Sequence, residues 1–244
     1  MTKTQEVSST VVKAISIINY LNDVSGPQGV SDISKGLGLS TTIVHRLLTT
    51  LKLEGMVFQD PRSKLYTLGT IFLDYANKIL TEMPIAPVVE PWLMSLRNET
   101  GETVGFYMPT GQIRICVLEY ESQQEIRRSV GIGKRLPLHL GASGRAILAF
   151  QSSDQQERVL GTLSVQERND LEHILQEVRN QGYATNEEEI SSNVAALSVP
   201  VFDKQQRVIG ALSVSGPLFR WNRETMEPYI ACVIAASKEI TDAL

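Results

Sequence analysis

The first third of the chain repeats apolar positions with the period of an α-helix. In STVVKAISIINYLND at 9–23, Val11, Ile15, Ile18 and Leu21 recur at helical spacing, which predicts a helix that Ser9 could cap. The segment GPQG at 26–29 interrupts it. A shorter helix is predicted to start at Ser31, whose hydroxyl could accept a free amide, and its buried side would be Val30, Ile33 and Leu37.

A third helix is predicted from Ser40 onward. One stripe of it is apolar (Ile43, Val44, Leu47, Leu48 and Leu51), and the opposite side carries Thr42, His45, Arg46 and Thr49. EG at 54–55 ends the helix, and two strands at 56–59 and 64–68 follow, joined by the turn DPRS. Three helices and a hairpin in about sixty residues predict a winged helix-turn-helix.

The next segment, GTIFLDYANKILTEM at 69–83, is predicted to be helical with a wide apolar face. That face comprises Ile71, Phe72, Tyr75, Ala76, Ile79 and Leu80. It is wider than a linker needs, so we expect it to pack on another chain. Prolines 84, 87 and 91 mark a junction, and a helix over about 87–99 follows.

Beyond residue 100 the pattern changes to a mixture of strands and helices. Strand-like runs lie at 103–108, 113–119, 126–130, 194–202 and 208–215, and predicted helices lie at 143–150, 153–160, 164–180 and 222–242. Strands with segregated helices indicate the α+β fold class.

Composition and charge narrow the function classes. Hydrophobic residues make up 42% of the 244 positions and charged residues 20%, as in ordinary globular domains. No apolar run approaches the roughly 18 residues of a membrane helix, and the amino terminus lacks a signal sequence, so we expect a cytoplasmic protein without a membrane partner. The net charge of −4 divides unevenly. Residues 1–68 hold seven Lys/Arg and five Asp/Glu (+2), and the remainder holds 16 and 22 (−6), which favours a nucleic-acid partner for the first segment.

The polar face of the third helix suits the major groove of DNA. Hydroxyl side chains at helix starts reach phosphates, arginine can bond guanine through two donors, and histidine can donate to base acceptors. Arg62 and Lys64 in the hairpin could contact the backbone or the minor groove. The alternative is a solvated helix in a protein-binding winged helix. The candidate DNA contacts are Ser31, Ser40, Thr41, Thr42, His45, Arg46, Thr49, Arg62 and Lys64.

The segment LPLHLGASGRAILAF at 136–150 also allows an enzyme interpretation, a hydrolase with Ser143 as nucleophile and His139 as base. A nucleophile elbow requires Gly-x-Ser-x-Gly, whereas Ser143 is followed directly by Gly144. We therefore favour a helix start with small residues facing a cavity. The acidic run 187–189 is predicted to be a solvated loop. The three histidines are scattered and the two cysteines have no metal spacing, so neither a metal nor a cofactor is expected.

The adjacent residues Arg127 and Arg128 form a second candidate site. Neighbouring strand residues point to opposite faces, so one arginine would face inward if 126–130 is a strand. A ligand carboxylate would satisfy a buried guanidinium. A structural ion pair or simple exposure at a sheet edge is the alternative.

Three long stretches together resemble the isocitrate-lyase-regulator (IclR) family of bacterial transcription regulators. STTIVHRLLTTLKLEGMVFQDPRSKLYTLG resembles its recognition helix and wing, LPLHLGASGRAILAF its central hallmark, and GYATNEEEISSNVAALSVPVFDKQQRVIGALSVSGP its second half. The resemblance covers nearly the whole chain. It implies a winged helix-turn-helix over 1–69 (helix-turn-helix at 29–52, wing at 56–68), a linker helix with dimer contact over 70–85, and a GAF-like effector-binding domain over 86–244.

The resemblance also implies double-stranded operator DNA as a partner, homodimers that can pair into tetramers, and repression as the commoner mode. It places the effector, expected to be a small organic acid, against Ile126, Arg128, Leu136, Ala142, Ser143, Asn186, Val194, Ala196, Ser213 and Ser215. Ser213 and Ser215 match the hydroxyls that usually hold an effector carboxylate. Asn186, Ala196 and Arg128 depart from the common aspartate, cysteine and apolar wall, so the effector cannot be transferred from a relative. The hydrolase and a protein-interaction module are the competing functions.

Overall fold

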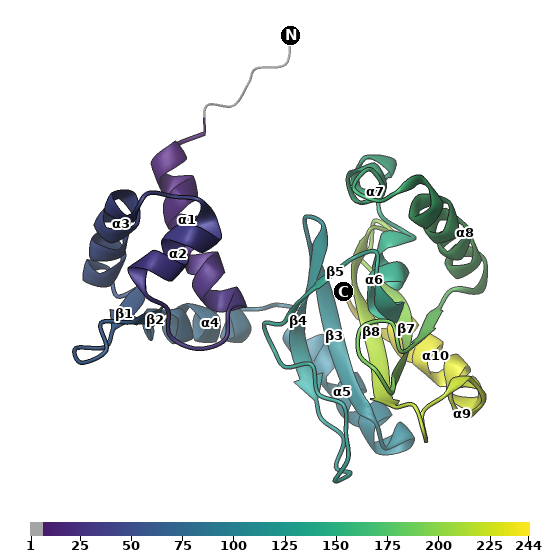
Figure 1. The fold of residues 1–244 in the computed structure, drawn as a ribbon. Coiled ribbons are helices and arrows are strands. Elements are labelled where there is room, and N and C mark those ends of the chain that lie inside the picture. The colour runs from purple at the N-terminus through teal and green to yellow at the C-terminus, as the bar shows by residue number, and fades with distance from the viewer. Residues whose placement is uncertain (1–6) are drawn as a thin grey trace. The chain divides into compact units, whose positions relative to one another are not determined.

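The structure, a computed structural model, describes residues 7–244 and divides the chain into two compact units between Met83 and Pro84 (Figure 1). Among these residues, no helix combines the length and the apolar character required to span a membrane. The predicted α+β class, with a winged helix-turn-helix ahead of a larger antiparallel domain, is confirmed.

The first unit contains three helices, a hairpin and a fourth helix. These are α1 (Ser9–Asp23), α2 (Val30–Leu37), α3 (Thr41–Leu53), β1 (Val57–Gln59), β2 (Tyr66–Leu68) and α4 (Ile71–Thr81). Its core gathers one face from every element up to β2, at Ile17, Leu21, Ile33, Val44, Leu47, Leu48, Leu51, Val57 and Tyr66. The three helices thereby bury a shared core that none of them could build alone.

Two details of this unit differ from the sequence predictions. The buried face of α1 is formed by Ile17 and Leu21, while Val11 and Ile15 are 55% and 51% exposed, because the helix carries apolar residues on two sides and only one meets the core. The α2 helix begins at Val30 rather than Ser31. Its start is capped by Asp32, whose carboxylate accepts the amide of Gly29 at 3.3 Å.

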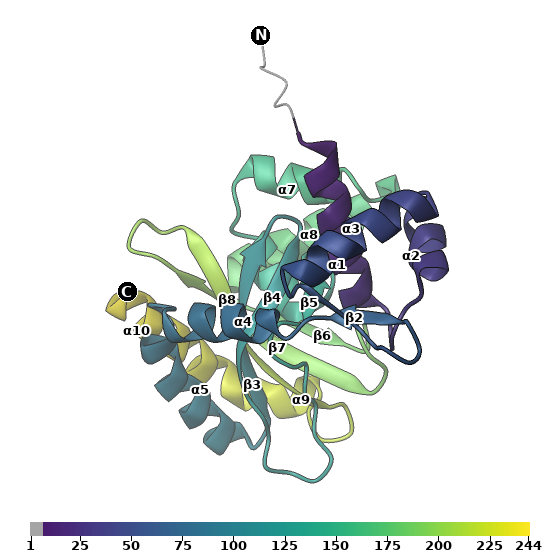
Figure 2. The ribbon, with the colours of Figure 1, turned by 90° about the vertical axis from the view of Figure 1, so that its left-hand side faces the viewer.

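The second unit is built on a six-stranded antiparallel sheet with strand order β5-β4-β3-β8-β7-β6. The strands are β3 (Thr103–Thr110), β4 (Ile113–Tyr120), β5 (Arg135–Pro137), β6 (Ala184–Glu187), β7 (Val194–Phe202) and β8 (Val208–Pro217). Helices α5 (Ala86–Thr100) and α10 (Ile230–Ala243) lie side by side against the sheet, as Figures 1 and 2 show. Helix α6 (Gly141–Leu148) also packs on β7 and β8. Two further helices follow it in the chain, α7 (Ser153–Leu160) and α8 (Val165–Gln181), and α8 packs against α6.

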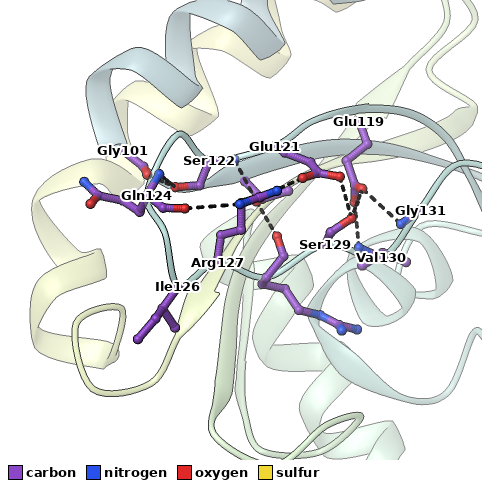
Figure 3. Close-up of polar contacts among 12 residues, drawn as sticks. Gly101, Glu119, Glu121, Ser122, Gln124, Ile126, Arg127, Ser129, Val130 and Gly131 are labelled. Atoms are coloured by element: carbon purple, nitrogen blue, oxygen red, sulfur yellow. Dashed lines mark hydrogen bonds and ion pairs between the residues drawn. The ribbon is translucent and has the colours of Figure 1, made fainter.

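The predicted strand at 126–130 is wrong, because this segment is an irregular loop. Its backbone amides bond to side chains instead of a neighbouring strand: the Glu119 carboxylate accepts Val130 N at 2.9 Å and Gly131 N at 3.0 Å (Figure 3). Ser129 Oγ donates to the same carboxylate at 2.8 Å. Glu119 of β4 therefore holds the end of this loop, at residues 129–131.

Three further elements were not anticipated. The short strands β5 and β6 form the two edges of the sheet, where three or four residues are too few to give a clear alternation. The predicted helix 222–242 is divided into α9 (Arg223–Met226), a 3₁₀ turn (Glu227–Tyr229) and α10. Pro228 lies in that turn, and its missing amide hydrogen interrupts the helical bonding.

Candidate functional site

One candidate surface is the exposed side of α3. Ser40 caps the helix by accepting the amide of Ile43 at 3.4 Å, as its position predicts. Val44, Leu47, Leu48 and Leu51 are buried. The predicted DNA contacts on this helix are all exposed: Thr41, Thr42, His45, Arg46 and Thr49.

The turn between β1 and β2 carries the remaining cations of this surface. The Asp60 carboxylate accepts Ser63 N at 2.6 Å and Arg62 N at 2.9 Å. The bond from the Ser63 amide is the main reason that the pKa of Asp60 is lowered. Lys64 has a φ of 61°, and both Arg62 and Lys64 are exposed. The turn is therefore held by its own backbone bonds while its two cationic side chains stay free of the core.

The wing and the helix are linked directly. Lys52 Nζ, in the last turn of α3, donates to Gln59 Oε1 of β1 at 3.1 Å. Ser31, the remaining candidate, is exposed in the first turn of α2.

The second candidate site is a cavity of about 40 Å³ in the larger unit. Nine of the ten residues proposed for the effector line it, and Ile126 does not, being 64% exposed on the irregular loop. Two arginines line the cavity and no aspartate or glutamate does. The full lining is Tyr107, Arg114, Arg128, Val130, Leu136, Ala142, Ser143, Asn186, Ile190, Ser191, Val194, Ala196, Ser213 and Ser215.

The adjacent arginines at 127 and 128 have different surroundings. Arg127 Nε pairs with Glu121 at 2.7 Å (Figure 3), and Arg127 is not part of the cavity lining. Arg128 lines the cavity, and its carbonyl oxygen accepts the hydroxyl of Thr103 on β3. That backbone anchor, not strand alternation, decides which arginine faces the cavity.

Two buried serines of β8 also line the cavity. Ser213 and Ser215 are two residues apart in the strand and so share one face. Ser198 Oγ of β7 donates to Ser213 Oγ at 2.7 Å, so the Ser213 proton remains available to a ligand.

Arg114 is a lining residue that the sequence reasoning missed. It lies in β4, is only 1% exposed, and donates from Nε to Ser143 Oγ at 2.7 Å and from Nη1 to the carbonyl of Pro137. Burial lowers its pKa to about 10, which leaves it charged at neutral pH. The signal was present in IRICVLE, where Arg114 has the same parity as the buried Cys116 and Leu118.

The Ser143–His139 pair has no hydrolytic geometry. Ser143 Oγ accepts its bond from Arg114, a guanidinium that cannot act as a base. His139 is half-buried, and burial lowers its pKa. The predicted role of this segment, small residues facing a cavity, agrees with Ala142 and Ser143 in the lining.

The acidic run at 187–189 is exposed, as the sequence predicts: Glu187 ends β6, and the other two glutamates lie in the bend after it. Glu189 pairs with Arg145 Nη1 at 2.6 Å and accepts the amide of Gly141 at 2.9 Å. The side chain of Asn186 accepts the amide of Ala142 at 2.9 Å. These acceptors satisfy the free amides at the start of α6, which any buried helix start requires. Within residues 7–244, no group of three or more His, Cys, Asp or Glu side chains is placed to hold a metal ion.

Comparison with known families covers both units. Residues 10–61 match the family model described as the IclR helix-turn-helix domain, and residues 77–242 match that of the bacterial transcriptional regulator IclR C-terminal domain. Members of this family are transcriptional regulators without enzymatic activity, which removes the hydrolase alternative.

The similarity to individual relatives extends over most of the chain. The HTH-type transcriptional regulator XynR of Escherichia coli K12 is 30% identical over 219 residues, covering 86% of each protein. The transcriptional repressor IclR of the same organism is 26% identical over 242 residues, covering 95% of this chain and 88% of the relative. Among solved structures, an IclR homolog from Microbacterium hydrocarbonoxydans complexed with 4-hydroxybenzoate shares the fold. Its TM-score is 0.76 at 20% identity, over 96% of this chain and 98% of the other.

Regulators of this family bind operator DNA through the helix-turn-helix domain. With both family models matched in order, the chain belongs to the IclR family of bacterial transcriptional regulators.

Proposed function

We propose that this regulator is a repressor that binds its operator as a homodimer and is controlled by a small carboxylate. The observation that carries the proposal is the cavity, whose lining combines Arg128, Ser213 and Ser215 with no acidic side chain. The printed names of relatives, such as the transcriptional repressor IclR, support repression.

In the proposed complex, the exposed side of α3 enters the major groove. Arg46 donates two bonds to a guanine and His45 contacts a neighbouring base, since both project from the face opposite the buried leucines. The remaining candidates make phosphate contacts that position the helix: Ser31, Ser40, Thr41, Thr42, Thr49, Arg62 and Lys64. The protein-interaction alternative predicts no steep fall of DNA affinity with salt, whereas phosphate contacts require one.

The dimer would form through α4. This helix buries none of its residues within the chain, and Leu73 and Ile79 are 72% and 62% exposed. Val11 and Ile15 of α1 present a second exposed apolar surface in the same unit. Apolar surface of this kind marks a protein contact, and a two-fold dimer presents two recognition helices to two half-sites. Pairing of dimers into tetramers is part of the proposal, from the family resemblance.

The effector would be a carboxylate held by Arg128 and the hydroxyls of Ser213 and Ser215. A charged donor makes a hydrogen bond roughly twice as strong as a neutral one. The relative complexed with 4-hydroxybenzoate carries a carboxylate ligand, which supports this ligand class. A cavity of about 40 Å³ holds only a few waters, so a larger acid must widen it. A ligand that prefers the widened arrangement shifts the population of states, and this would change the affinity for DNA.

The test uses the full chain and acid–amide pairs, acetate with acetamide and benzoate with benzamide. Thermal unfolding should show a higher Tm with at least one acid than with its amide, because binding to the native state stabilises it. An operator obtained by binding-site selection is then titrated with the protein, with and without that acid. We expect the acid to change operator affinity. If no acid raises the Tm above its amide, the carboxylate effector is wrong. If operator affinity is unchanged by a bound acid, the regulatory role is wrong.

The arginine assignment has its own control pair. Arg128→Met should reduce the preference for the acid, and Arg127→Met should keep it, because Arg127 pairs with Glu121 outside the cavity. The reverse result would assign the ligand contact to Arg127.

A further inference from the structure

We infer that Arg114, beside Arg128, is a second and buried arginine that selects for an anionic ligand in this cavity. The inference rests on the proposed carboxylate effector and adds a buried specificity determinant. Arg114 differs from Arg128 in burial, since it is 1% exposed while Arg128 is half-buried.

The first argument is the missing counter-ion. A guanidinium removed from water is destabilised by several kcal/mol unless a negative charge or enough acceptors replace the water. None of the ion pairs among the described residues includes Arg114. The acidic side chain that influences it, Glu189, is engaged by Arg145 and by the Gly141 amide. A ligand carboxylate in the adjoining cavity would supply the negative charge that Arg114 lacks.

The second argument is the orientation of the guanidinium. The bonds from Nε to Ser143 and from Nη1 to Pro137 fix the plane of the group, and neither uses Nη2. Nη2 lies at the start of α6, because a Cβ built on Gly141 would be 3.2 Å from it. The planar fork therefore keeps donors available, already ordered, in a residue that lines the cavity.

Ser143 extends this arrangement. Since its oxygen accepts from Arg114, its own proton is free to be donated to a ligand. With the Ser213 hydroxyl, the two serines and the guanidinium present hydrogen-bond donors from β4, α6 and β8. An ionised carboxylate accepts hydrogen bonds and donates none, whereas an amide also carries NH₂ donors. This set of donors therefore matches an acid and mismatches its amide.

Gly144 of α6 is consistent with the role inferred for Arg114. A Cβ on Gly144 would lie 2.6 Å from Arg114 Nη1 and would also collide with the carbonyl oxygen of Leu138. The absence of a side chain at this position thus makes room for the guanidinium.

The experiment compares matched substitutions in the full chain. Calorimetry with benzoate and benzamide is performed on the wild type, Arg114→Gln, Arg128→Gln and the control Arg127→Gln. Loss of one partner of a buried charge pair should weaken benzoate binding by about 30-fold or more in Arg114→Gln. Benzamide binding should change by less than about threefold, since the lost charge mainly favours the acid. Arg128→Gln should show a smaller loss, and Arg127→Gln none.

Two results would separate this inference from the proposed function. If Arg114→Gln binds benzoate like the wild type while Arg128→Gln does not, Arg114 is structural and the carboxylate effector stands. If the wild type fails to distinguish any acid from its amide, the effector proposal fails and the inference with it.

A measurement on the wild type covers the case in which Arg114→Gln does not fold. The Nε–H signal of Arg114 is assigned by its absence from the spectrum of Arg114→Lys and followed in ¹⁵N NMR during titration with benzoate. We expect a shift that saturates with the calorimetric Kd and does not occur with benzamide. An unmoved signal at saturating benzoate contradicts the inference.

Discussion

Single side chains in this protein take their roles from their partners. Arg127 is tied to Glu121 at the surface, whereas Arg128, one residue later, lines the cavity because its carbonyl is bonded to Thr103. Arg114 and Ser143 are 29 positions apart and share one hydrogen bond. The chemistry of the cavity is therefore a property of contacts between distant residues.

The arginines of the DNA-binding unit give a test at the same scale. Arg46→Ala should cost about 1–3 kcal/mol of operator binding and relax the preference at one base pair, since a base contact carries sequence information. Arg62→Ala should weaken binding to all sequences alike and reduce the salt slope by about 1, as expected for a phosphate contact. Binding-site selection and salt titration measure both effects. Unchanged base preference in Arg46→Ala would reassign the recognition residue.

At the level of elements, the free amides at helix starts find acceptors either in the local sequence or in distant parts of the fold. The α3 start is satisfied locally by Ser40, whereas the α6 start takes its acceptors from Asn186 and Glu189, more than 40 residues away. The start of α6, whose first turn consists of small residues, is therefore bonded to β6 through Asn186. The candidate effector residues Ala142 and Ser143 lie in that turn.

The serine caps supply a prediction for these elements. Ser40→Ala should lower the free energy of unfolding of the first unit by about 1 kcal/mol, because a free amide loses its acceptor. Ser31→Ala is the control. Ser31 is exposed inside the first turn of α2 and the cap there is Asp32, so we expect a change within about 0.5 kcal/mol. Chemical denaturation monitored by circular dichroism measures both. Equal losses would show that α3 does not depend on its serine.

The whole molecule separates two tasks into two units. Residues 1–68 carry a net charge of +2 and the remainder −6, so attraction to phosphates is expected at the winged helix-turn-helix. The cavity lies entirely in the second unit. In the proposed mechanism, the effector and the operator would therefore influence each other through an arrangement of the units, or of the proposed dimer, that each ligand prefers.

The assembly is tested through α4. Phe72→Asp with Ile79→Asp should give monomers with greatly reduced operator affinity, since charge placed in an apolar contact opposes association and a monomer reads a single half-site. Asn77→Asp with Thr81→Asp adds the same charge on the polar side of the helix and should leave the dimer intact. Sedimentation velocity distinguishes the two, and a dimer in the first variant would exclude α4 as the interface.

The sequence by itself determined the order of elements in the first unit, the exposed side of α3 and the main strands of the second. Helical and strand periodicity are local properties, and Gly, Pro and Ser mark their ends within a few residues. It also supplied nine of the fourteen residues that line the cavity, through ordered resemblance to a family rather than through periodicity.

Only the tertiary structure decided the remainder. Segment 126–130 is a loop whose end is held by the Glu119 carboxylate through the amides of Val130 and Gly131. Glu189 pairs with Arg145 and accepts an amide at the α6 start. Arg114 is buried and donates a hydrogen bond to Ser143. Each outcome depends on a polar group whose partner lies 11 or more residues away along the chain, and no local pattern encodes such a partner.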